Sequence, residues 1–139
     1  MPSFRLLDKS TTCASDKEVY IEALRALQLR ASNLFSQVRQ LCTTRRRTFF
    51  ARDPAALFPG SPHLAEVKSH YSQLVPGWYA DTNLSNKQKE RVLMYACAVA
   101  GIEYLEAFEV RFEAGHYSPL SRGEATRLAD ELLEELRRI

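Results

Sequence analysis

Two glutamates, Glu103 and Glu106, are the side chains in this sequence best suited to carry chemistry. They lie three residues apart in a segment that we predict to be helical from residue 85 to 114. At about 100° per residue, both project within roughly 60° of the apolar stripe that this helix would bury. Because an isolated buried carboxylate costs several kcal/mol, each glutamate needs a cation, a metal ion or a shared proton.

Side chains three apart on one helical face can converge on one hard cation, such as Mg²⁺ or Mn²⁺. A metal ion held there would position and activate water for phosphodiester hydrolysis. The sequence therefore predicts Glu103 and Glu106 as metal ligands and catalytic residues. The alternative is that both glutamates form ion pairs with arginines of neighbouring helices, or lie at a solvated edge.

A second group of residues combines arginines with aromatic side chains. Guanidinium groups bind phosphates in a bidentate manner, and aromatic rings accept unstacked bases, so this combination favours single-stranded nucleic-acid binding. The alternative is that the arginines complement the negative end of the first predicted helix, while the aromatic rings anchor the loop in the core. The group consists of Arg45, Arg46 and Arg47, flanked by Arg39 and Arg52, with Phe49 and Phe50.

Four segments carry helical periodicity, and none shows the alternation of a strand. The first, 15–41, opens with a capping-box spacing at Ser15 and Glu18. Its apolar stripe runs for about seven turns and resembles the apolar seam of a coiled coil. The others span 61–74, 85–114 and 121 to the end of the sequence. The segment from 85 has an apolar centre on every side, so neighbours should surround it.

These segments predict an all-α antiparallel helical bundle with a long first helix that favours oligomers. Residues 1–14 are predicted as a flexible N-terminus, and 15–139 as a single helical domain with a basic loop at about 43–61. A second capping-box spacing at Ser85 and a third at Ser121 mark the starts of the last two helices.

Length and composition narrow the class of protein. The chain has 139 residues, of which 45% are hydrophobic, enough for one packed domain. Its net charge of +2 is the sum of +5 over residues 1–60 and −3 over the remaining residues. The first 60 residues would therefore attract a polyanion. Three separated cysteines, no apolar leader and no long apolar run predict a cytoplasmic or nuclear protein that is not secreted.

Three stretches resemble the translin family, which includes translin-associated factor X. Residues 16–41 resemble the family's long opening helix, and 66–74 resemble its second-helix segment. The third stretch, 101–107, resembles the factor X pattern of a glutamate, an aromatic residue, an aliphatic residue and a second glutamate, which fall on Glu103 and Glu106. With the turn at 120–124, the likeness covers most of residues 16–130.

The resemblance implies an all-α protein that forms homo-oligomers, or hetero-oligomers with a translin-like subunit, and binds single-stranded RNA or DNA. In the factor X branch it implies a Mg²⁺-dependent endoribonuclease. The family supplies a further catalytic acid from helices beyond residue 139, and neither Asp130 nor Glu131 matches it. The alternative function is a non-catalytic helical adaptor that binds another protein through its long first helix.

Overall fold

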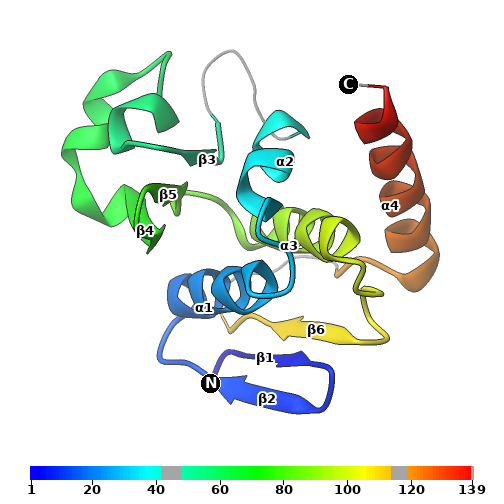
Figure 1. Cartoon of the computed structure of the whole chain (residues 1–139). Coiled ribbons are helices and arrows are strands. Elements are labelled where there is room, and N and C mark those ends of the chain that lie inside the picture. Colours follow the sequence, from blue (N-terminus) through cyan, green and yellow to red (C-terminus); the bar gives the residue numbers. More distant parts are fainter. Residues whose placement is uncertain (42–47, 114–118, 139) are drawn as a thin grey trace.

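The computed structural model describes residues 1–41, 48–113 and 119–138 (Figure 1). The chain contains both helices and strands, and three short 3₁₀ turns at Pro54–Leu57, Pro62–Glu66 and Lys68–His70 precede the fourth strand. In chain order the elements are β1 (Ser3–Leu6), β2 (Lys9–Thr12), α1 (Asp16–Gln28), α2 (Leu34–Leu41), β3 (Phe50–Ala51), β4 (Tyr71–Val75), β5 (Trp78–Asp81), α3 (Asn86–Ala100), β6 (Phe108–Arg111) and α4 (Arg122–Arg137).

The predicted all-α bundle is wrong, because the chain forms two antiparallel sheets of three strands each. One has the order β2-β1-β6 and the other β3-β5-β4. Helices α1, α2 and α3 lie between the two sheets (Figure 1). Residues 1–14, predicted as a flexible terminus, supply β1 and β2. These strands have only four residues each, too few for an alternating pattern to stand out from the helical periodicities beside it.

The predicted first helix is also two elements. Helix α1 ends at Gln28, the chain turns through residues 29–33, and α2 begins at Leu34. The apolar stripe continues across the break because both helices pack on α3, so the periodicity of the sequence hides the turn. Ser15 caps α1 as predicted, accepting a hydrogen bond from the Glu18 N–H, while Glu18 reaches back to the Ala14 N–H.

The predicted second helix at 61–74 is replaced by 3₁₀ turns and strand β4. Leu64 and Tyr71 pack against a small separate core with Leu57 and Phe58, whereas Leu74 belongs to the main core and Val67 is exposed. The Pro76-Gly77 pair forms the turn between β4 and β5. Gly77 has a φ of 85°, a conformation that favours glycine in tight turns.

Helix α3 forms the centre of the main core, as its apolar middle predicts. Val92, Leu93 and Met94 are buried, and α3 packs against α1, α2 and α4. Cys97 is buried in the same place, and this burial raises the pKa of its thiol, which is typical of a packing residue. None of the helices in the described ranges has the length and apolar character that crossing a lipid bilayer requires.

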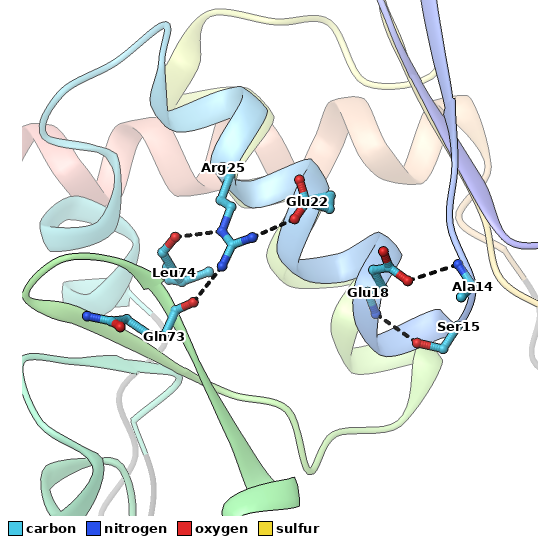
Figure 2. Close-up of polar contacts among 7 residues, drawn as sticks. All are labelled: Ala14, Ser15, Glu18, Glu22, Arg25, Gln73 and Leu74. Atoms are coloured by element: carbon cyan, nitrogen blue, oxygen red, sulfur yellow. Dashed lines mark hydrogen bonds and ion pairs between the residues drawn. The ribbon is translucent and has the colours of Figure 1, made fainter.

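One arginine joins the helical layer to the second sheet. Arg25 on α1 points its guanidinium at the end of β4, where Nε donates to the Leu74 carbonyl at 2.6 Å and Nη2 to the Gln73 carbonyl at 2.9 Å (Figure 2). Its Nη1 pairs with Glu22 on the same helix at 2.5 Å. Arg25 therefore holds β4 against α1 through backbone carbonyls that β4 presents toward the helix.

Candidate binding cleft between α3 and α4

Glu103 and Glu106 do not lie on a helix. Helix α3 ends at Ala100, and Gly101 adopts a left-handed conformation with φ of 73° at its C-cap. The Gly101 and Ile102 N–H groups donate back to the last turn of the helix, which closes it. The prediction of a helix to residue 114 is therefore wrong, and both glutamates are exposed in the segment 101–107 that follows. Their inward projection along a buried stripe, the geometric argument for the site, does not hold.

The two glutamates nevertheless border one cleft. A cavity of about 460 Å³ opens between α3, α4 and the segment 101–106, and Glu103 and Glu106 both line it. Asp130 of α4 lines the opposite wall. The sequence thus identified residues that share a surface, although it did so from a helix that does not form there.

The floor of the cleft is apolar and is kept open by small side chains. Met94 and Ala98 stand four apart on α3, while Ala125, Ala129 and Leu133 repeat every four residues on α4. Met94 is fully buried, whereas Ala98, Ala129 and Leu133 are half-buried and face the opening. Because an alanine ends at Cβ, three of them along the facing helices leave a hollow where larger side chains would meet.

The rim of the cleft carries more negative than positive charge. Three carboxylates, from Glu103, Glu106 and Asp130, face one guanidinium, from Arg122, a formal balance of −2. Arg122 Nη1 pairs with Glu106 Oε1 at 2.5 Å, and the two side chains are 69% and 49% exposed. This pair joins the segment after α3 to the first residue of α4. Such an exposed pair is typically worth at most about 1 kcal/mol.

The predicted Mg²⁺ site receives no support from side-chain clustering. Within residues 1–41, 48–113 and 119–138, no three histidine, cysteine, aspartate or glutamate side chains gather closely enough to hold a metal ion. Glu103, Glu106 and Asp130 line one cleft without forming such a group. Catalysis and metal binding by Glu103 and Glu106 stay predictions from the sequence.

A buried carboxylate that the sequence analysis missed positions both walls of the cleft. Glu90 on α3 is only 3% exposed. Its Oε2 accepts a hydrogen bond of 2.7 Å from the Tyr104 hydroxyl, and its Oε1 accepts one of 3.1 Å from the Leu120 N–H. Tyr104 belongs to the segment after α3, and Leu120 directly precedes the N-cap of α4. Glu90 lies one turn before Met94 and two turns before Cys97. This helical spacing is the signal in the sequence that indicates a buried position for Glu90.

Helix α4 begins where its capping box predicts. The Ser121 hydroxyl accepts a hydrogen bond from the Glu124 N–H, and the Glu124 carboxylate accepts bonds from the Ser121 hydroxyl and N–H. These bonds hold the pKa of the exposed Glu124 below its usual value. Leu132 is buried, while Leu128, Leu133 and Leu136 are half-buried, so one side of α4 covers the core and another faces the cleft.

The predicted nucleic-acid-binding arginines are only partly described. Arg45, Arg46 and Arg47 lie outside the described residues. Arg39 is exposed near the end of α2. Arg52 follows β3, with its guanidinium carbon 4.3 Å above the Trp78 ring and Nη1 donating to the Gly77 carbonyl.

The alternative role for the two phenylalanines of this group, anchoring in the core, agrees with their burial. Phe50 is fully buried, and Phe49 packs against the main core. Comparison with models of protein families, with curated proteins and with solved structures gave no significant match to this chain.

Proposed function

We propose that this chain is a protein-interaction module that binds a segment of a partner protein in the cleft between α3 and α4. The observation that carries the proposal is a cavity of about 460 Å³ with an apolar floor and a charged rim. Ligand sites in proteins are concave and mostly apolar, with a few polar groups that fix orientation. The cleft has this composition, and its half-buried Ala98, Ala129 and Leu133 offer apolar surface to a ligand.

The polar groups of the cleft favour binding over catalysis. The Thr126 hydroxyl donates to the Arg122 carbonyl at 2.9 Å within α4, and the Tyr104 hydroxyl donates to Glu90. Glu106 is paired with Arg122. Neither histidine nor cysteine is among the described residues that line the cavity. The hydroxyls are thus held by the fold, which leaves an apolar floor and charges at the rim as the features that a partner would meet.

A cleft-filling substitution tests this function. Peptides selected from a random display library against the full chain should lose at least about tenfold in affinity for Ala129→Trp, because the indole would occupy the space where an apolar anchor binds. The matched control is Ala55→Trp, which adds the same ring at an exposed alanine of a 3₁₀ turn that lines none of the cavities described. Fluorescence anisotropy with labelled peptides measures the affinities, and circular dichroism checks that both variants fold.

The reverse pattern would overturn the proposal. If selected peptides bind Ala129→Trp as tightly as the unmodified chain, their site lies elsewhere. Should Ala129→Trp fail to fold, Ala98→Leu fills the same cleft from the α3 side with a smaller change and decides the question.

A second proposal, single-stranded nucleic-acid binding, is supported by the Arg52–Trp78 pair. Arg52 is exposed and its guanidinium lies over the Trp78 ring, so a cation suited to phosphate and an aromatic side chain share one surface. Trp78 also packs against Phe35 with ring centroids 6.1 Å apart, and Arg39 lies one turn beyond Phe35 on α2. The net charge of +5 over residues 1–60 also favours the binding of a nucleic acid.

Binding of labelled single-stranded RNA to the full chain tests the second proposal. The affinity for RNA should fall steeply as the salt concentration rises. The double variant Arg39→Ala and Arg52→Ala should bind RNA at least about tenfold more weakly. The control is the double variant Arg127→Ala and Arg138→Ala, which removes two exposed arginines from α4 and its C-cap. Equal loss in both double variants would indicate nonspecific attraction and reject this surface.

A further inference from the structure

The charge of the cleft defines the kind of partner that fits it. Its rim has a formal balance of −2, with Glu103 and Glu106 on the segment after α3 and Asp130 on α4. A segment with cations beside its apolar anchors would therefore find opposite charge on both sides of the cleft.

The backbone around the cleft favours a helical partner over an extended one. An extended peptide needs a row of free N–H and C=O groups to pair with. In the segment 101–107, the N–H groups of Gly101, Ile102, Leu105, Glu106 and Ala107 all donate to carbonyls within the chain. The other walls are helices, whose backbone groups bond along the helix. A helix satisfies its own backbone, so it can occupy this cleft with side chains alone.

The length of the cleft indicates about three helical turns. On α4 the lining residues extend from Arg122 to Leu133, which is roughly 16 Å at a rise of 1.5 Å per residue. Apolar side chains one turn apart on the partner would then meet the floor at Ala98, Ala129 and Leu133.

Arg122 is the cation that already occupies part of this surface. Its pair with Glu106 at 2.5 Å lies at the rim of the cleft, and the two side chains are 69% and 49% exposed. An incoming lysine or arginine could take its place on Glu106 at little cost, because exposed pairs are weak.

Building on the proposed function, we propose that the partner segment is a basic amphipathic helix, and that Arg122 competes with its cations for Glu106. Removal of Arg122 should then strengthen binding, although it removes a contact from the free protein. Charge reversal at Glu103, which is exposed at the rim, should weaken binding.

Two synthetic peptides of about 12 residues test this inference. Both carry leucines at helical spacing; one has lysine at the remaining positions, and its twin has glutamate. Each is titrated into the full chain at low and high salt, with binding followed by NMR shifts of the backbone amides. The basic peptide should bind the full chain, and its affinity should fall as the salt concentration rises. It should bind Arg122→Ala about threefold more tightly than the unmodified chain, and Glu103→Lys about tenfold more weakly. Ala55→Trp is the control for an unrelated surface change.

The possible failures are distinguishable. The inference of a basic partner helix is rejected if the glutamate peptide binds as tightly as the basic peptide, or if Arg122→Ala lowers the affinity for the basic peptide. Neither result contradicts the proposed binding of a partner in the cleft. If the basic peptide binds Ala129→Trp as tightly as the unmodified chain, the proposed function fails as well. If the chain forms a dimer that Glu103→Lys dissociates, the occupant is a second copy and the inference is rejected.

Discussion

Replacing Glu90 with alanine should lower the free energy of unfolding by about 3 kcal/mol. The substitution leaves the Tyr104 hydroxyl and the Leu120 N–H without the acceptor that now binds them at 2.7 and 3.1 Å. Glu90 is 3% exposed, so water cannot fully replace its carboxylate. Urea denaturation followed by circular dichroism measures the loss. Because Leu120 directly precedes α4, that helix should also lose protection from hydrogen exchange.

Tyr104→Phe is the matched control for Glu90→Ala. It removes one of the two donors and keeps the carboxylate on the Leu120 N–H, so it should cost about 1 kcal/mol. A loss for Glu90→Ala no larger than that for Tyr104→Phe would contradict the role of Glu90 in holding α4. Arg127→Ala, which breaks an exposed pair on α4, should change the unfolding free energy by less than about 1 kcal/mol.

The starts of helices could be predicted from the sequence because capping depends on a few adjacent residues. Ser15, Ser85 and Ser121 all accept a hydrogen bond from the N–H three residues on, as their spacing predicts. The fully apolar middle of α3 is surrounded by other elements, also as predicted. These features are local or follow from the need to bury an apolar surface.

The ends of helices and the strands could not be predicted in the same way. The apolar periodicity of α1 and α2 is continuous, but a turn at residues 29–33 lets each pack separately on α3. Gly101 ends α3 by taking a left-handed conformation, although the sequence predicts a helix to residue 114. Strand β1 forms because β2 and β6 pair on either side of it, and β6 lies about 100 residues away. Pairing at that distance leaves little local signal.

In the candidate site, too, the features set by neighbouring residues could be predicted, and those set by distant parts of the chain could not. Glu103 and Glu106 were identified by their spacing, and they do border one cleft, but its other walls come from α4. The alanines that keep the cleft open have no chemical character that a motif search would notice. Glu90 was detectable from its place on the buried face of α3, whereas its partners Tyr104 and Leu120 are set by how the chain returns after the helix.

Arg25→Met should lower the free energy of unfolding by about 2 kcal/mol. The change keeps an unbranched apolar stem but removes the charged hydrogen bonds to the Leu74 and Gln73 carbonyls at 2.6 and 2.9 Å (Figure 2). Because the Arg25 side chain is 43% exposed, water replaces part of these bonds, and the loss is smaller than for a fully buried group. Urea denaturation measures it, and hydrogen exchange should show faster opening of β4 and β5 than of α3.

Glu22→Gln separates the two roles of Arg25. It weakens the ion pair on α1 and leaves both bonds to β4 in place, so it should cost about 0.5 kcal/mol or less. Equal losses for the two variants would mean that Arg25 acts within α1 and does not hold the second sheet. Arg25→Lys should fall between them, because a lysine ammonium lacks the planar fork that reaches two adjacent carbonyls and Glu22 together. A graded series of this kind would show that the attachment of β4 to α1 depends on the geometry of the guanidinium as well as on its charge.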